Sequence, residues 1–478
     1  MARAERKIEM ELYELGIKEA RAAIERGEIC CEDLVKAIIG RYREANGSIG
    51  AYLTFDEEGA LEAARKNPKS VPIGIKDLIN VAGQPCTCAS KILKGYVSPY
   101  DATVVKRLKE NGFIPAGRLN MDEFAMGSST ENSALGKTRN PYDLTRVPGG
   151  SSGGSAAAVG GNLCIAALGT DTGGSIRQPA SFCNCYGLKP SYGRVSRFGV
   201  TAFASSLDQV GPMTKSVDDA AILLGAIAGH DEMDGTTPKE EVPDYLAALE
   251  GADMKGVRIG LPKEYYQVQG LDGEVKKITE EAVAKCVANG AVVEEVSLPH
   301  TEYAMAVYYI IAPAEASANL ARFDGVRYGH RSAESKDIYS LYTKTRAEGF
   351  GPEVKRRIIM GTYVLSSGYY DAYYGRAQKV RTLIRRDFEE VFKKVDVLLT
   401  PCAPTPAFKF GELQDPLTMY LNDLYTIPSA LAGVCAASLP AGFTANGNLP
   451  VGVQLICGGF EETKLLKVSK ALENIIRR

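Results

Sequence analysis

The sequence predicts an α/β protein with one large central mixed β-sheet that helices cover on both faces. Short apolar runs have the length of strands buried on both faces, stretches with helical spacing alternate with them, and no Pro/Ser/Gly linker or low-complexity segment divides the 478 residues. We therefore expect a single domain over residues 1–478. Within it we expect amino-terminal helices over about 1–65, a core over about 66–220 and a second half over about 221–478.

Helices are predicted at both ends of the chain. The first forty or so residues predict two helices. The second would follow Cys31-Glu32-Asp33, where Ser or Thr would cap better than Cys31. Its apolar face is formed by Leu34, Val35, Ile38 and Ile39. A closing amphipathic helix is predicted from residues that recur at helical spacing, namely Leu465, Val468, Leu472 and Ile475.

Six apolar runs between these helices predict the buried strands of the sheet. They are residues 71–75, 113–116, 163–168, 257–261, 395–399 and 451–456. Helical stretches lie between them, and this alternation favours one central mixed sheet over separate domains.

Charge and composition exclude several classes of protein. The formal net charge is -2 and no long basic run is present, so the chain lacks the electrostatic footprint of an autonomous nucleic-acid binder. Any RNA contact would need a partner. No apolar stretch approaches the length of a membrane span, and we therefore expect no membrane association.

The cysteines and the amino terminus favour a reducing compartment. Among the eleven cysteines, the close pairs at 30–31, 86–88 and 183–185 lack the Cys-x-x-Cys spacing of a zinc site, so we expect free thiols. Residues 1–16 mix glutamates with basic residues and contain no apolar core of a signal peptide. Both features predict a cytoplasmic protein.

Two Gly-Gly-Ser elements are the most informative feature of the chain. They occupy residues 148–155 and 169–175 and flank the apolar run at 163–168. Glycine pairs let backbone N–H groups approach a reacting atom, and amides aimed at one point stabilise an oxyanion. Ser175, which follows Thr172-Gly173-Gly174 where a strand could pass into a helix, is therefore a candidate nucleophile.

A serine nucleophile needs a base, and the histidines are poor candidates for one. His230, His300 and His330 are the only three, and none lies in a motif typical of catalysis. A lysine can act instead if burial holds it neutral near pH 7. Lys76 lies in an apolar segment over 71–81, where an ammonium would be poorly solvated. By pattern alone, a lysine extending from a strand edge fits this position equally well.

Three motifs together resemble the signature of the amidase-signature hydrolases. They are Pro-Ile-Gly-Ile-Lys-Asp at 72–77, Gly-Gly-Ser-Ser-Gly-Gly-Ser at 149–155 and Gly-Thr-Asp-Thr-Gly-Gly-Ser-Ile-Arg at 169–177. The resemblance implies a Ser-Ser-Lys triad, with Ser175 as nucleophile, Ser151 in a cis peptide after Gly150 as proton shuttle, and Lys76 as base. It also implies an oxyanion hole made of the backbone amides from Thr172 to Ser175, including Gly173 and Gly174. The fold it implies is an α/β/α sandwich with the catalytic core in the first half.

Two other interpretations of the glycine-rich segments are weaker. A flexible linker is disfavoured because the buried helical pattern Ala156-Ala157-Ala158-Val159 follows at once. A phosphate-binding P-loop around Gly136-Lys137-Thr138 fails because Glu131 stands where that motif requires glycine, and the glycines at 149–154 do not fit a dinucleotide fingerprint.

The second half resembles one branch of that family, the A subunits of glutamyl-tRNA(Gln)/aspartyl-tRNA(Asn) amidotransferases. The stretches that carry this likeness are residues 308–312, 315–320, 323–329, 353–358 and 415–423. The resemblance implies that Tyr308, Arg357 and Asp423 bind free glutamine, and the register leaves Tyr309 and Arg356 open as alternatives. An arginine fork suits the α-carboxylate and an aspartate suits the α-ammonium.

The resemblance implies a glutaminase that uses no metal and no cofactor of its own. Ammonia from glutamine would pass to a B subunit that uses ATP and Mg to amidate mischarged tRNA, with a small C subunit completing a heterotrimer. The B subunit would make the main contacts to tRNA, so this chain does not tell whether Glu-tRNA(Gln), Asp-tRNA(Asn) or both are acceptors. A free-standing amidase of small or lipid amides and a catalytically inactive scaffold are the alternatives.

Overall fold

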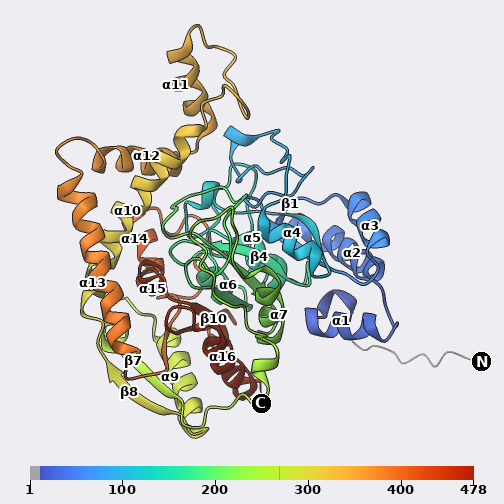
Figure 1. Ribbon diagram of the computed structural model, residues 1–478, viewed down its shortest axis with the longest axis vertical. Helices are drawn as coiled ribbons and strands as arrows, with labels where there is room; N and C mark the ends of the chain where they lie inside the picture. The colour runs from blue at the N-terminus through green and yellow to red at the C-terminus, as the bar shows by residue number, and fades with distance from the viewer. Residues whose placement is uncertain (1–10, 269, 478) are drawn as a thin grey trace, which may run out of the picture.

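A computed structural model describes residues 11–268 and 270–477 of the chain (Figure 1). The expectation of an amino terminus without a signal peptide falls mainly on residues outside this description. Within the described residues, eleven strands form one sheet in the order β1-β3-β2-β4-β6-β5-β10-β11-β9-β7-β8. Their bounds are β1 Tyr52–Thr54, β2 Val71–Lys76, β3 Phe113–Leu119, β4 Ala167–Asp171, β5 Tyr186–Lys189, β6 Gln209–Thr214, β7 Arg258–Pro262, β8 Val292–Val296, β9 Val397–Pro401, β10 Ala436–Phe443 and β11 Pro450–Ile456.

The sheet is mixed, as the sequence predicts. β2 pairs in parallel with β3 and β4, and β7 pairs in parallel with β8 and β9. The strands between these two groups, and the edge strand β1, pair antiparallel. Lys76 and Asp171 end the parallel neighbours β2 and β4, so the first half of the chain delivers two candidate segments to the same edge of the sheet.

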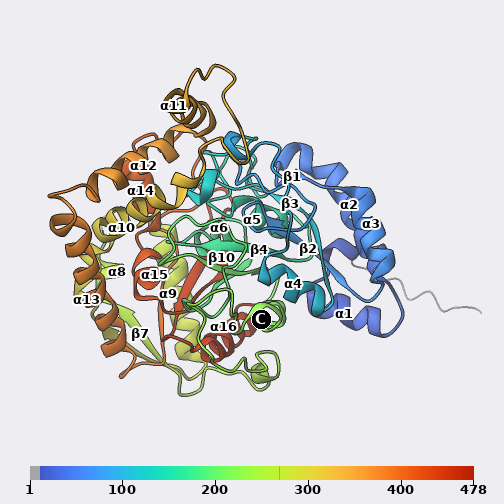
Figure 2. The ribbon, with the colours of Figure 1, turned by 45° about the horizontal axis from the view of Figure 1, so that its top comes forward.

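Helices surround the sheet in Figures 1 and 2. Their bounds are α1 Ile17–Glu25, α2 Cys31–Ile49, α3 Glu57–Lys66, α4 Thr103–Glu110, α5 Gly153–Gly160, α6 Arg177–Phe182, α7 Val217–Ile227, α8 Lys263–Tyr266, α9 Gly273–Ala288, α10 Ala304–Asn319, α11 Ile338–Gly349, α12 Pro352–Val364, α13 Arg376–Val391, α14 Pro416–Tyr420, α15 Ile427–Ala432 and α16 Glu462–Ile476. Short 3-10 turns include η1 Leu12–Glu14, η2 Lys91–Leu93, η3 Glu123–Ala125, η4 Ala247–Leu249, η5 Pro299–Tyr303, η6 Leu320–Arg322 and η8 Leu421–Asp423, and η7 Asp371–Gly375 is a π-helical turn.

Two neighbouring residues of β5 show that helices cover both faces of the sheet. Successive side chains of a strand point to opposite faces. The Tyr186 hydroxyl hydrogen-bonds Ser469 of α16, whereas a Cβ added at Gly187 would meet Ala180 of α6. α16 and α6 therefore lie on opposite faces, which confirms the predicted α/β class.

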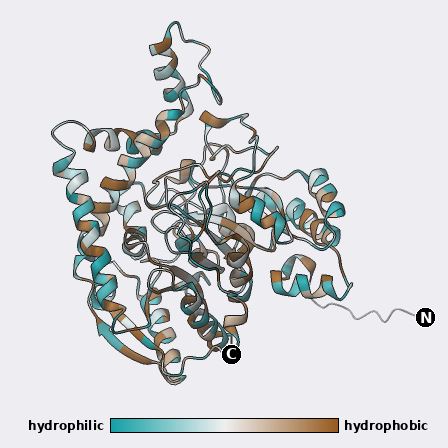
Figure 3. Cartoon of the chain, viewed as in Figure 1, coloured by the Kyte–Doolittle hydropathy of each residue, from teal (hydrophilic) through white to brown (hydrophobic). Residues whose placement is uncertain are grey.

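The helices expected at the two ends are present. α2 begins at Cys31, and its cap is Cys30 rather than Cys31, because the Asp33 carboxylate accepts the Cys30 N–H at 2.8 Å. α16 buries the predicted apolar face, with Leu465 and Leu472 fully enclosed. Figure 3 shows that the outlying α13 is largely hydrophilic along its length.

Five of the six predicted strands lie where expected, and the sixth is shifted. The run at 163–168 forms strand only from Ala167 onward, because its first residues close α5: Asn162 has a positive φ of 59°, and the Leu163 N–H donates to the Ala158 carbonyl at 2.8 Å. β7 is not buried on both faces, since Arg258 is exposed where it pairs with the outermost strand, β8.

The sequence does not reveal the remaining five strands. β6 and β10 contain Gly-Pro and Leu-Pro pairs, β1 and β5 have only three and four residues, and β8 is exposed along most of its length. Proline, short length and glutamate all weaken the strand signal. The strands form because their neighbours in the sheet supply the pairing.

The cysteines agree with the expectation of free thiols. All eleven cysteines lie in the described residues and are free. None of the described helices is long and apolar enough to cross a membrane.

Candidate active site

Lys76 is completely buried among hydroxyl groups at the end of β2. Its Nζ lies 2.8 Å from Ser151 Oγ, 2.8 Å from Ser152 Oγ and 2.9 Å from Thr170 Oγ1. No carboxylate of the described residues forms an ion pair with it. The alternative of a lysine extending from a strand edge is therefore wrong.

Burial lowers the pKa of this lysine. Desolvation lowers the pKa of Lys76 to about 7, against a smaller opposing effect of the carboxylates of Asp122, Asp171 and Asp208. Near neutral pH a large fraction of the amine is then uncharged. Such an amine can accept a proton from the Ser151 hydroxyl, which is the property that a base requires.

The two serine motifs lie against each other beside Lys76. The peptide bond between Gly150 and Ser151 is cis, as the family resemblance implies. The Ser152 N–H donates to the Ser175 carbonyl at 3.1 Å, and Ser175 itself is 7% exposed in the loop between β4 and α6. The structure therefore brings Lys76, Ser151 and Ser175 into one cluster.

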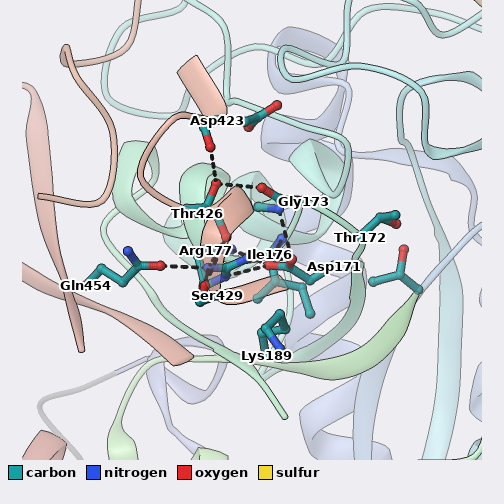
Figure 4. A network of polar contacts seen from close by, with 12 residues as sticks. Asp171, Thr172, Gly173, Ile176, Arg177, Lys189, Asp423, Thr426, Ser429 and Gln454 are labelled. Carbon is teal, nitrogen blue, oxygen red and sulfur yellow. Dashed lines mark hydrogen bonds and ion pairs between the residues drawn. The ribbon is translucent and has the colours of Figure 1, made fainter. Parts of the chain in front are cut away.

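A buried ion pair anchors the loop that carries Ser175 (Figure 4). Arg177 donates to both carboxylate oxygens of Asp171, at 2.8 and 2.9 Å, and both side chains are fully enclosed. Burial alone would raise the pKa of Asp171, but the Arg177 guanidinium outweighs it and lowers the pKa. The other side of Arg177 reaches the second half of the chain, where it donates to the Thr426 carbonyl, Ser429 Oγ and Gln454 Oε1.

The backbone between Asp171 and Ser175 is held by side chains on several sides. Thr172 Oγ1 donates to Asp208 at 2.7 Å, and the Gly174 N–H donates to Asp171 Oδ1 at 2.9 Å. The Gly174 amide is thus already engaged on the protein side. As donors to a substrate oxyanion, this leaves the amides of Thr172, Gly173 and Ser175 as the better candidates.

The three residues expected to bind glutamine come from three different elements, and two of them, Tyr308 and Asp423, lie against this loop. The Tyr308 ring, on α10, lies against Gly173, where an added Cβ would approach the ring within 2.8 Å. Asp423 ends η8, accepts a hydrogen bond from Ser128 and lies 3.2 Å from the position of a Cβ at Gly174. Burial raises the pKa of Asp423 to about 7, although Ser128 and Arg357 lower it in part.

Arg357, on α12, is enclosed by aromatic rings and one carboxylate. Its guanidinium lies 5.4 to 5.6 Å from the ring centres of Phe203, Tyr309 and Tyr420. Its Nε donates to Glu353 Oε1 at 2.8 Å, and the Tyr420 hydroxyl donates to the same oxygen at 2.9 Å. Burial disfavours the charged form, but the surrounding tyrosines and Glu353 raise the pKa of Arg357 above its ordinary value.

The surroundings of these residues bear on the register left open by the sequence. The Arg357 side chain is 3% exposed, whereas that of Arg356 is 44% exposed. Arg357 is therefore the buried member of the pair. Tyr308 and Tyr309 both line the cluster, Tyr308 facing the Ser175 loop and Tyr309 facing Arg357.

Comparison with known proteins identifies the family. A family model described as amidase matches residues 33–466 of the chain. The chain belongs to the amidase signature family. The A subunit of glutamyl-tRNA(Gln) amidotransferase from Carboxydothermus hydrogenoformans is 56% identical over 477 residues, which cover 97% of this chain and 98% of that protein.

Solved amidase structures share the architecture. The crystal structure of the A subunit of glutamyl-tRNA(Gln) amidotransferase from Thermotoga maritima has a TM-score of 0.82 and 44% identity, over 97% of this chain and 95% of that one. The native peptide amidase from Stenotrophomonas maltophilia has a TM-score of 0.80 and 28% identity, over 97% of each chain. The fold of this amidase is thus common to enzymes with different names.

The structure adds residues to this amidase site that sequence reasoning missed. Ser152, Ser128, Glu353, Tyr420 and Thr426 all contact a predicted site residue or its hydrogen-bond partner. Two had a local signal: Ser152 follows Ser151 in the same motif, and Glu353 stands four residues before Arg357 on one helix face. The others come from distant segments, which only the fold brings together.

The three histidines of the amidase are engaged elsewhere. His230 Nδ1 contacts the Thr237 carbonyl, His300 pairs with Asp387, and His330 pairs with Glu348. These contacts agree with the structural roles expected for them and leave Lys76 as the candidate base.

Proposed function

We propose that this chain is the glutamine-hydrolysing A subunit of a tRNA-dependent amidotransferase. One observation carries the proposal. The catalytic cluster around Lys76 and the group of residues expected to bind glutamine lie on different sides of the same loop, which carries Ser175. A lysine of lowered pKa lies beside two serines, and Asp423 and Tyr308 lie against the glycines of the loop, with the charged Arg357 near enough to both to affect their pKa values. The 56% identity to an A subunit over nearly the full chain supports the same conclusion.

The chemistry assigns one step to each member of the triad. Ser175 Oγ attacks the side-chain amide carbon of glutamine while its proton passes to Ser151 Oγ, and the Ser151 proton passes to neutral Lys76. The relay then reverses and protonates the leaving nitrogen, so that ammonia and a glutamyl ester of Ser175 form. Water hydrolyses the ester to glutamate and restores the serine. Backbone amides of the loop from Thr172 to Ser175 stabilise the tetrahedral oxyanion.

The second cluster matches the other end of glutamine. Arg357 offers a permanently charged fork to the α-carboxylate, and Asp423 offers its carboxylate to the α-ammonium. Tyr308, packed on Gly173, lies between this end and Ser175. A zwitterionic amino acid with a side-chain amide can engage both groups at once, whereas a simple amide has neither an α-carboxylate for Arg357 nor an α-ammonium for Asp423.

The remaining steps belong to partners. We propose that a B subunit uses ATP and Mg to activate the misacylated tRNA, Glu-tRNA(Gln) or Asp-tRNA(Asn), and receives the ammonia, and that a small C subunit completes a cytoplasmic heterotrimer. This chain then needs no cofactor of its own, because an amide is hydrolysed by serine and lysine alone. A free-standing amidase is the alternative, but the Stenotrophomonas peptide amidase is 28% identical, half the value for the Carboxydothermus protein.

The test uses the complex reconstituted with B and C subunits. Ser175→Ala is expected to abolish glutamine-dependent amidation of tRNA and to leave amidation fed by ammonium intact. Ser155→Ala is the matched control, because that serine, on α5, is also buried but donates to the Leu168 carbonyl of strand β4. Glutamine-dependent transfer by the Ser175→Ala complex would overturn the nucleophile. Failure of the wild-type chain to support any tRNA-amidating partner would overturn the function.

A further inference from the structure

The peptide unit between Gly173 and Gly174, next to the proposed nucleophile, is clamped at both ends. Its carbonyl accepts a hydrogen bond from Thr426 Oγ1 at 2.6 Å, and its N–H donates to Asp171 Oδ1 at 2.9 Å. Gly174 has a φ of +146°, a conformation that residues other than glycine rarely adopt. Without these two bonds, a peptide flanked by two glycines would rotate easily.

Thr426 also belongs to the turn that presents Asp423. Its N–H donates to the Asp423 carbonyl at 3.1 Å, and its own carbonyl accepts from Arg177 at 2.9 Å. Its Oγ1 also lies 3.1 Å from the Asp423 carbonyl, but the Gly173 carbonyl, at 2.6 Å, is the closer acceptor for the hydroxyl proton. The residue is fully buried, and a Cβ at Gly174 would meet Thr426 Oγ1 at 2.2 Å. Figure 4 shows Thr426 between Asp423 on one side and Gly173 on the other.

We propose that Thr426 is a positioning residue that locks the Gly173–Gly174 peptide in the orientation needed for acylation of Ser175 and ties it to the Asp423 turn. The inference rests on the proposed function, since it assumes that Ser175 is the nucleophile. A flipped peptide would point the Gly173 carbonyl at the Asp171 carboxylate, and the changes in ψ at Gly173 and φ at Gly174 would strain the loop on which the flanking amides of Gly173 and Ser175 lie. The Thr426 hydroxyl opposes that flip because it is the donor that holds the carbonyl.

The hydroxyl, rather than the bulk of the side chain, performs this role. Thr426→Val keeps the shape and removes the donor, so kcat for glutamine hydrolysis should fall about 30-fold, a fraction of the loss that follows removal of a complete oxyanion donor. KM should rise less, by about 3-fold, because the Asp423 turn keeps its backbone bonds. Thr426→Ser keeps the donor, and kcat should stay within about 3-fold of wild type.

The experiment measures glutamine hydrolysis by the complex and, separately, the rate at which a small fluorophosphonate phosphonylates Ser175, forming the Oγ–P bond and releasing fluoride. Thr279→Val is the matched control, because Thr279 is also fully buried and also donates to a backbone carbonyl, that of Val275 at 2.8 Å in the remote helix α9. The control should leave both rates within about 2-fold of wild type. Should Thr426→Val not fold, Thr426→Ala removes the same hydroxyl.

The proposed role is supported if Thr426→Val is slow, and Thr426→Ser is near wild type, in both glutamine hydrolysis and the reaction with the fluorophosphonate. Valine rates within about 3-fold of wild type, or a serine variant as slow as valine, would overturn it. If the wild-type complex does not hydrolyse glutamine, the proposed function fails, while the phosphonylation rates of the variants still decide the role of Thr426.

Discussion

Lys76 and Arg357 are both buried cations of the same site, yet their surroundings drive them to opposite charge states. Lys76 is surrounded by the hydroxyls of Ser151, Ser152 and Thr170, and its pKa is lowered to about 7. Arg357 has the carboxylate of Glu353 and the faces of three aromatic rings, and its pKa is raised. Burial alone therefore does not set the charge; the chemical type of the partners does.

The difference matches two different tasks. A hydroxyl can hydrogen-bond a neutral amine but carries no negative charge. The hydroxyls around Lys76 therefore do not offset the free-energy cost of desolvating its ammonium form. The Glu353 carboxylate and the aromatic faces offset that desolvation cost for the guanidinium of Arg357. The catalytic cluster thereby gains a proton acceptor, and the recognition cluster keeps a charge for the substrate carboxylate.

Among the variants that test the two charge states, Lys76→Arg has the largest expected effect on activity. Guanidinium stays protonated at any usable pH, so the arginine variant should lose about 10³-fold or more in kcat, nearly as much as Lys76→Ala. Steady-state glutamine hydrolysis measures it. Substantial glutaminase activity in the arginine variant would show that a neutral base at this position is not required.

Changes on the recognition side should act on binding. Arg357→Ala and Asp423→Asn should each raise KM for glutamine about 100-fold and leave the rate of Ser175 phosphonylation by the fluorophosphonate within about 3-fold of wild type. Arg356→Ala is the control, since that side chain is 44% exposed. A larger loss in the Arg356 variant than in the Arg357 variant would reverse the register, and unchanged KM in both Arg357→Ala and Asp423→Asn would remove the glutamine site.

Glu353→Gln tests whether the carboxylate paired with Arg357 contributes to glutamine binding. The amide keeps the shape but removes the charge, so KM should rise about 10-fold with kcat nearly unchanged. Glu390→Gln, which breaks only an exposed pair with Lys393, should leave KM unaltered. A fall in kcat as large as the rise in KM would instead place Glu353 in the chemistry.

The two clusters differ in how far the sequence predicts them. The catalytic cluster lies in short continuous motifs, so Lys76, Ser151 and Ser175 could be named from local pattern and family resemblance, and the structure places them together. The recognition cluster could be named only by resemblance, because Tyr308, Arg357 and Asp423 are separated by long stretches and each alone resembles a surface or core residue.

What the sequence could not predict depends on tertiary contacts. Phe203 and Tyr420 meet Arg357 from distant parts of the chain, and Thr426 meets Gly173 across 253 residues. The same holds for the fold: β10 was missed because Pro440 interrupts its pattern, although β5 and β11 pair with it on either side. Such residues carry no local periodicity that would mark them.

The pH dependence of the reaction of Ser175 with a fluorophosphonate tests the central claim most directly. Because the pKa of Lys76 is lowered to about 7, its neutral form increases as the pH rises through that value. The rate of phosphonylation by a small neutral fluorophosphonate, which does not use Asp423, should rise about tenfold per pH unit below that point and level off above it. Asp423→Asn should show the same profile. A rate that is flat between about pH 6 and 9, or that keeps rising toward the ordinary lysine pKa of about 10.4, would contradict a neutral Lys76 at the site.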